Sequence, residues 1–152
     1  MTVPVHTLSK WGQRFLAMAR HVSGWSRDPS TKVGCVLVNR RNIVVGLGFN
    51  GFPRGVADLQ DRYIDRSVKY LMVKHAEENA VLNSIGDLQG ATAYVTHPCC
   101  SQCTGTLIQA GIKRIVTASP TEAMRERFAD SFKAAAIMAR EAGVTMVEVD
   151  GI

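Results

Sequence analysis

Two short segments of the sequence carry side chains that could bind a metal and move a proton. His75-Ala76-Glu77 places an imidazole two residues before a carboxylate, and Cys100-Ser101-Gln102-Cys103 places two thiols three residues apart. One imidazole and two thiolates suit a catalytic zinc site, which keeps its fourth position open for water. Two thiolates also cancel the formal charge of Zn²⁺. The spacing therefore predicts a zinc site on His75, Cys100 and Cys103.

The place of these residues in the predicted helices determines what each can do. Residues 101–110 form a predicted helix that Gly111 ends, and the N-terminal dipole of this helix stabilises sulfur anions. Positions i and i+2 lie about 200° apart on a regular helix, so His75 and Glu77 cannot face one side inside it. We therefore place His75 at the start of a helix 76–84. Glu77 is then a proton carrier beside the metal and not a ligand.

Hydrophobic periodicity predicts two longer helices. One amphipathic helix has an apolar stripe that consists of Trp11, Phe15, Met18, Val22 and Trp25. The turn-forming segment 28–30 follows it. Gly143 ends a second long helix, whose apolar positions are Met124, Phe128, Ala135, Met138 and Ala142. Between these two helices, residues 50–70 form a polar connection. A connection of about twenty residues inside a compact domain more often has a function than serves only to join two elements.

Five strands are predicted from apolar runs between turn signals. They cover residues 33–38 and 43–49, which form a hairpin, and then residues 91–96, 112–117 and 144–149. The long helix between the last two strands lets them run parallel through a crossover. The sequence thus predicts a three-layer α/β/α fold around a mixed five-stranded sheet whose last two strands are parallel. Residues 1–152 suit a single domain.

The composition restricts the class of protein. The chain of 152 residues is 46% hydrophobic, and no apolar run reaches the roughly 18 residues of a membrane span. Its N-terminus lacks the apolar core of a signal peptide, so we expect a cytoplasmic protein with no membrane partner. The formal charge of +5 favours anionic ligands, but the basic residues form no run, and we expect no nucleic-acid partner. Cys35 lies in an apolar run and is expected in the core.

The chain resembles the deoxycytidylate deaminases of the cytidine deaminase superfamily from about residue 11 to residue 149. The matching segments are Ser26–Gly34, Gly48–Gly55, His75–Ala80 and Tyr94–Cys103. The H-x-E and C-x-x-C pattern is the signature of zinc nucleobase deaminases, and the other segments narrow the resemblance to the nucleotide branch. The family has Pro immediately before the first ligand Cys, where this chain has Cys99. Only Cys100 has the zinc spacing to Cys103, so Cys99 is not expected to be a ligand.

The resemblance implies a cytidine-deaminase-like fold and an activity. The expected reaction is zinc-dependent hydrolytic deamination of dCMP to dUMP and ammonia, which supplies dUMP for thymidylate synthesis. Glu77 would take a proton from water and pass it to the base. The resemblance further implies that Asn50 holds the sugar hydroxyl, that Val33 packs on the pyrimidine, and that the backbone of Ala76 contacts the base. A plain strand position for Val33 and an Asn-Gly turn at Asn50 are the competing interpretations.

Phosphate and effector sites are predicted on other segments. Ser26, Arg27 and Lys32 supply a hydroxyl and two cations just before the strand at Val33, and they are our candidates for the 5′-phosphate; an ordinary surface loop is the competing interpretation. The resemblance implies a homohexamer activated by dCTP with Mg²⁺ and inhibited by dTTP. The residues that match the effector region are Gly51, Phe52, Arg54, Gly55 and Asn79.

Two other kinds of function remain open. A tRNA-editing or free nucleoside or base deaminase would use the same zinc ligands, and only the pocket beyond the base would distinguish it. A non-catalytic zinc protein is the second alternative. Glu77 argues against it, because a structural zinc site takes a fourth protein ligand and needs no carboxylate beside the metal.

Overall fold

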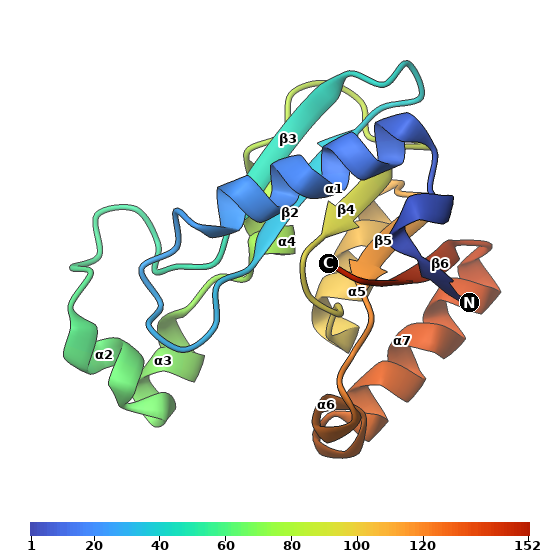
Figure 1. Cartoon of the computed structure of the whole chain (residues 1–152). Helices are drawn as coiled ribbons and strands as arrows, with labels where there is room; N and C mark the ends of the chain where they lie inside the picture. Colours follow the sequence, from blue (N-terminus) through green and yellow to red (C-terminus); the bar gives the residue numbers. More distant parts are fainter.

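A six-stranded mixed sheet forms the centre of the computed structural model, which describes residues 1–152 (Figure 1). The strands are β1 (Thr2–Pro4), β2 (Gly34–Val38), β3 (Val44–Phe49), β4 (Thr92–Val95), β5 (Arg114–Ala118) and β6 (Thr145–Asp150), in the spatial order β1-β6-β5-β4-β2-β3. Strand β2 is antiparallel to β3 and β4, whereas β4, β5, β6 and β1 are parallel. The predicted mixed sheet with parallel last strands is confirmed.

Helices cover both faces of the sheet. One face is covered by α1 (Lys10–Ser23); the other carries α4 (Ala76–Leu82), α5 (Ser101–Ala110) and α7 (Ala129–Ala142). Successive residues of β2 alternate between these layers, because Val36 belongs to the apolar cluster of Leu16 whereas Cys35 and Leu37 belong to that of Ala80. The predicted three-layer α/β/α architecture is therefore confirmed, and Cys35 lies in the core as expected.

The sheet has six strands, one more than the five predicted. The additional strand, β1, pairs in parallel with β6, with Val3 opposite Val149. It has only three residues and ends at Pro4, so it offers no alternation of polar and apolar side chains that a sequence pattern could detect. Its pairing partner lies at the other end of the chain.

The buried face of α1 differs from the predicted stripe. Phe15 and Val22 are buried, but Trp11, Met18 and Trp25 are 48%, 40% and 50% exposed. Gly12, Leu16 and Ala19 complete the buried face instead. The reason is a close approach: a Cβ on Gly34 of β2 would lie 2.0 Å from the carbonyl oxygen of Ala19. The backbone of α1 therefore lies close to β2 at Ala19, and Trp11, Met18 and Trp25 lie outside the buried face.

Two predicted segments contain helix boundaries that periodicity missed. The connection 50–70 includes α2 (Gln60–Ile64) and the start of α3 (Arg66–Met72), and the Asp65 side chain caps α3 by accepting from the backbone N–H of Ser67 and Val68. The predicted long helix before Gly143 is divided at Phe128 into α6 (Glu122–Arg127) and α7. Gly143 ends α7 with φ +70°, as predicted. None of the helices combines the length and the apolar character that crossing a membrane would require.

The packing of α4 on β3 fixes the position of the residues that could do chemistry. A Cβ on Gly48 would lie 2.4 Å from the backbone nitrogen of Ala80. Glycine at this position therefore lets the helix backbone lie directly on the strand. The N-terminus of α4, with His75 and Glu77, is held next to the N-terminus of α5.

Candidate metal centre and substrate cavity

Three side chains converge where α4 and α5 begin. His75 is the N-cap residue of α4, with an extended backbone (φ −75°, ψ 156°), and Cys100 is the N-cap residue of α5. His75 Nδ1 lies 3.2 Å from Cys103 Sγ and 3.6 Å from Cys100 Sγ. The three ligand atoms all lie within 4.8 Å of one another. One imidazole and two thiols in this arrangement fit a single tetrahedral Zn²⁺.

The first turn of α5 favours the thiolate form of Cys100. The backbone N–H of Cys103 donates to Cys100 Sγ over 3.4 Å. The hydrogen bond from the Cys103 thiol, together with that from His75, lowers the pKa of Cys100 to about 4, despite partial burial. The same interaction with Cys100 raises the pKa of Cys103. Cys100 is thus a thiolate near neutral pH, which is the form that binds metal.

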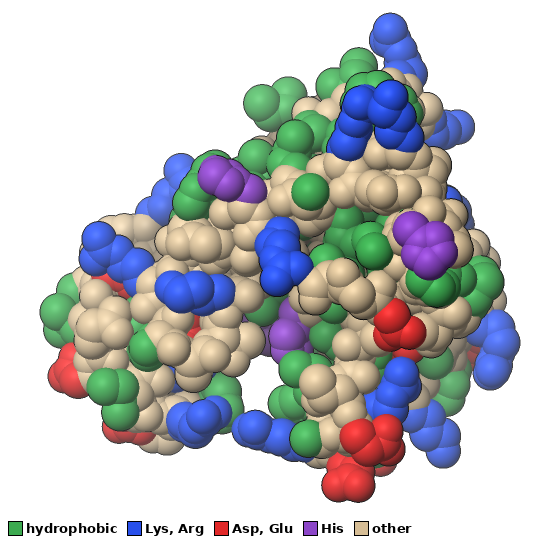
Figure 2. Space-filling view, viewed as in Figure 1, with side chains coloured by type: hydrophobic (Ala, Val, Ile, Leu, Met, Phe, Trp, Pro, Cys, Tyr) green, Lys and Arg blue, Asp and Glu red, His purple; other side chains and the backbone are tan.

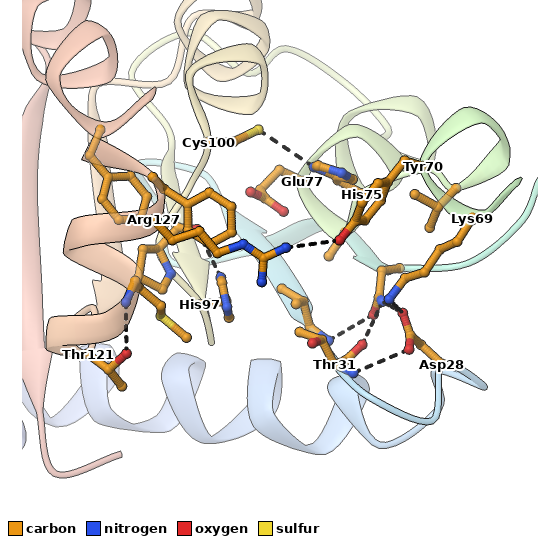
Figure 3. Close-up of a pocket in the computed structure, with 18 of the residues that line it drawn as sticks. Asp28, Thr31, Lys69, Tyr70, His75, Glu77, His97, Cys100, Thr121 and Arg127 are labelled. Atoms are coloured by element: carbon orange, nitrogen blue, oxygen red, sulfur yellow. Dashed lines mark hydrogen bonds and ion pairs between the residues drawn. The ribbon is translucent and has the colours of Figure 1, made fainter. Parts of the chain in front are cut away.

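Glu77 lies beside these ligands without being one of them. It is in the first turn of α4, is 4% exposed and lines the same cavity as His75 and Cys100 (Figure 3). His75 and Glu77 can share this cavity because His75 is outside the regular helix, as the two-residue spacing required. Burial raises the pKa of Glu77, against the lowering effect of its own backbone hydrogen bond and of His75. A buried carboxylate with a raised pKa suits a group that accepts and returns a proton near neutral pH.

Cys99 is not a member of the ligand cluster. It is buried in the apolar core together with Cys35, and its sulfur is not part of the group formed by His75, Cys100 and Cys103. Burial also raises the pKa of the Cys99 thiol, which disfavours the thiolate that a metal would need.

A cavity of about 700 Å³ begins at this cluster (Figure 3). Val33, Asn50 and Ala76, the predicted base and sugar contacts, all line it. The Asn50 side chain already has partners in the chain: its Oδ1 accepts from the backbone N–H of Val33, and its Nδ2 donates to the carbonyl of Thr31, both over 2.8 Å. Asn50 therefore holds the segment before β2 against the cavity.

The three predicted phosphate contacts do not line the cavity. The buried Ser26 hydroxyl donates to the carbonyl of Asn50 over 2.8 Å. Arg27 is largely exposed and faces Asp58, with Nε and Oδ2 separated by 3.8 Å. Lys32 donates to the carbonyl of Ser26. Ser26 thus helps to hold Asn50 in place, whereas Arg27 and Lys32 make their contacts outside the cavity.

The predicted effector residues also lie outside the main cavity. The Phe52 ring stacks on Tyr63 at a centroid distance of 4.2 Å, and Asn79 Nδ2 donates to the carbonyl of Phe49 over 2.8 Å. Gly51 pairs with Lys74, and Gly55 has φ +82°. Arg54 donates to Asn83 Oδ1 over 2.7 Å, and both line a second pocket of about 450 Å³ next to β3.

Several cavity residues were not predicted from the sequence. The polar ones include Arg66, Lys69, Tyr70, His97 and Arg127, and the apolar ones include Met124, Phe128 and Phe132. The length of the connection 50–70 was a signal for Arg66, Lys69 and Tyr70, which lie at its end. Nothing in the sequence around α6 indicated that Arg127 or the phenylalanines would face the site.

Lys69 and Asp28 form an ion pair that attaches α3 to the segment before β2. Lys69 Nζ lies 2.7 Å from Asp28 Oδ2, and the two side chains are 9% and 1% exposed. Asp28 Oδ1 also accepts from the backbone N–H groups of Ser30 and Thr31. Burial raises the pKa of Asp28, but Lys69 and these backbone donors outweigh it, so the pKa lies below its ordinary value.

Replacing Lys69 with methionine should lower the free energy of unfolding by about 3–5 kcal/mol, because it leaves Asp28 buried without a countercharge. Urea unfolding at neutral pH would measure this, with the exposed Lys133→Met on α7 as a control expected to stay within about 0.5 kcal/mol. The folded-state pKa of Asp28 is depressed, so the contribution of the pair exists at neutral pH and is lost in acid. The difference between the two variants should therefore shrink below about pH 4. Equal stability of both variants at neutral pH would contradict this role.

Comparisons with known proteins agree with this site. Residues 9–119 match the family described as the cytidine and deoxycytidylate deaminase zinc-binding region. Over 137 residues the chain is 42% identical to an uncharacterized deaminase in the luxG 3′ region of Aliivibrio fischeri, a match that covers 90% of this chain and 92% of that protein. It is 36% identical over 146 residues to the deoxycytidylate deaminase of Mus musculus, covering 90% of this chain and 78% of the mouse protein.

Solved structures share the fold. The dCMP deaminase of the cyanophage S-TIM5, in complex with dCMP and dUMP, has a TM-score of 0.73 at 24% identity, covering 95% of this chain and 99% of the phage chain. A structure from work on tRNA:A34 deaminases is more distant, with a TM-score of 0.54 at 19% identity and 91% of both chains covered. The match over residues 9–119 and the His75, Cys100 and Cys103 cluster lead to one conclusion. The chain belongs to the cytidine and deoxycytidylate deaminase family and is a hydrolytic deaminase with a zinc-binding site.

Proposed function

We propose that the protein removes the 4-amino group of dCMP by hydrolysis, giving dUMP and ammonia, and so supplies dUMP for thymidylate synthesis. The observation that carries the proposal is the buried Glu77 beside His75 and Cys100 at the inner end of one cavity. The cavity volume of about 700 Å³ lies within the usual range for small-molecule sites. The 36% identity to the mouse deoxycytidylate deaminase supports dCMP as the substrate.

The proposed reaction assigns metal binding and proton transfer to different residues. Zn²⁺ held by His75, Cys100 and Cys103 would supply the Lewis acidity that lowers the pKa of water. Glu77 accepts a proton as the water oxygen bonds to C4 of the cytosine ring, and it delivers that proton to N3. Glu77 then takes the proton of the hydroxyl on C4 and delivers it to the amine, so that the C4–N bond breaks, the C4 carbonyl forms and ammonia leaves.

Three cavity residues would hold the substrate during these steps. Val33 packs on the pyrimidine, the backbone of Ala76 contacts the base, and Asn50 holds the sugar hydroxyl. Asn50 Oδ1 has a second lone pair beyond the one that accepts from Val33, and this lone pair would accept from that hydroxyl.

We also propose that nucleoside triphosphates regulate the protein and that it assembles as an oligomer. As the sequence resemblance implies, dCTP with Mg²⁺ would activate a homohexamer and dTTP would inhibit it, through Gly51, Phe52, Arg54, Gly55 and Asn79. The position of Arg54 in a second pocket, away from Glu77, is compatible with a separate effector site. A cytoplasmic location and a single domain of residues 1–152 remain predictions of the same kind.

A substrate panel tests the proposed function. Zinc-loaded protein should convert dCMP faster than deoxycytidine by roughly 10²–10⁴-fold in kcat/KM, because charge-assisted bonds to the phosphate act only on the nucleotide. The panel should include cytosine, dCTP and a short RNA, and repeating the dCMP assay with dCTP and Mg²⁺ or with dTTP tests regulation. Equal rates on dCMP and deoxycytidine would indicate a free-nucleoside deaminase. Activity on RNA alone would indicate tRNA editing, and no activity on any substrate would indicate a non-catalytic zinc protein.

A further inference from the structure

The outer part of the cavity carries positive charge that the chain does not neutralise. Three cationic side chains line the cavity: Arg66, Lys69 and Arg127. Lys69 is paired with Asp28, at 2.7 Å. The other lining carboxylate, Glu77, is buried beside the metal ligands. Neither Arg66 nor Arg127 forms an ion pair, so two guanidinium groups remain without a countercharge.

These two guanidinium groups meet on one oxygen atom. Arg66 Nη1, from α3, and Arg127 Nη2, from α6, donate to the Tyr70 hydroxyl over 3.0 Å and 3.2 Å, respectively. Figure 3 shows the bond from Arg127. The Arg127 guanidinium also lies over the Phe128 ring, 5.0 Å from its centroid. The two like charges around the phenol repel each other. The hydrogen bonds from Arg66 and Arg127 stabilise the phenolate and lower the pKa of Tyr70. An anion placed between them would remove this repulsion.

Arg66 and Arg127 lie where the phosphate of a bound nucleotide would be expected. Glu77 is 4% exposed at the inner end of the cavity, whereas Tyr70 is 57% exposed. Figure 2 shows an opening between α3 and α6, with Lys and Arg side chains along its lower edge and a histidine at its upper edge. When the base of a bound nucleotide reaches Glu77, the phosphate of that nucleotide would lie near this opening. Each arginine has five N–H donors, and only one of those is used on Tyr70 in each case.

We propose that Arg66 and Arg127 together bind the 5′-phosphate of the substrate, with the Tyr70 hydroxyl keeping the two guanidinium groups within reach of one anion. This inference rests on the proposed function. It replaces Ser26, Arg27 and Lys32 as the phosphate contacts, since these three residues do not line the cavity. It also makes dCMP specificity depend on α3 and α6, two helices from distant parts of the chain.

Direct binding and kinetics test the proposal with Arg66→Gln and Arg127→Gln. Each should weaken binding of dUMP, measured by calorimetry, by about 10–100-fold, as expected for one charge-assisted contact. Binding of deoxyuridine and the slow turnover of deoxycytidine should stay within a few-fold of the unmutated protein. Arg125→Gln is the matched control, because Arg125 lies on the same helix but pairs with Glu148 at 2.9 Å and does not line the cavity. It should leave dUMP binding unchanged.

The outcomes separate this proposal from the proposed function. If the unmutated protein prefers dCMP and both variants keep that preference, the arginines do not bind the phosphate. The same conclusion holds if Arg27→Gln, and neither of the two cavity variants, loses dUMP affinity. If the unmutated protein binds dUMP no better than deoxyuridine, the proposed function itself fails.

Discussion

Glu77→Gln should keep its zinc and lose turnover of dCMP by about 10²–10⁴-fold, the usual contribution of a general acid–base group. Glutamine has nearly the size of glutamate and can hydrogen-bond, but it cannot accept and return a proton. Glu77 is almost fully buried, so bulk water cannot replace it as the proton carrier. Metal analysis and dUMP formation, measured on the same preparation, separate loss of the proton carrier from loss of the metal.

The matched control is Glu78→Gln. Glu78 is the next residue of the same helix, but its carboxylate pairs with Lys74 at 3.5 Å and accepts from the backbone N–H of His75 over 3.3 Å. Glutamine can still accept that bond, so turnover should change only a few-fold. Near-normal turnover in zinc-loaded Glu77→Gln would show that another group moves the proton.

Cys100→Ala and Cys103→Ala should each reduce bound zinc from about one ion per chain to almost none. Removal of a direct ligand should cost more than the 10–100-fold in affinity that is typical of losing a group that only supports a ligand. Inductively coupled plasma mass spectrometry after dialysis would measure the zinc content. Deaminase activity should disappear together with the metal.

Cys99→Ala provides the comparison that matters most for the ligand assignment. Cys99 is buried with Cys35 and lies outside the ligand cluster. Its replacement should lower stability by about 1 kcal/mol, an ordinary effect for a core substitution, and leave zinc near one ion per chain. Loss of zinc in Cys99→Ala, with zinc retained in Cys100→Ala, would reverse the assignment.

The ligand cluster could be predicted because each part of it is local in sequence. Spacing by three places Cys100 and Cys103 in one helical turn, and the incompatibility of His75 and Glu77 with a regular helix fixed His75 at its start. The layers of the fold could likewise be predicted from the order of apolar runs. Strand β1 could not, because three residues carry no periodic signal and only pairing with β6 makes them a strand.

The outer part of the cavity could not be predicted for a related reason. Arg66 and Tyr70 come from α3, and Arg127 from α6, so their meeting depends on how the two helices pack and on no local motif. The segment 26–32 looked suitable for a phosphate because it joins hydroxyls and cations next to Val33. In the folded chain those groups are used to order Asn50 and to pair with Asp58.

The most direct test of the account is the time course of dUMP and ammonia formation from dCMP by the purified, zinc-loaded protein, with Glu77→Gln measured alongside. We expect the unmutated protein to form both products in equal amounts, and Glu77→Gln, with the same zinc content, to be slower by at least about 10²-fold. Failure of the zinc-loaded protein to form dUMP, or equal rates in the two proteins, would contradict it.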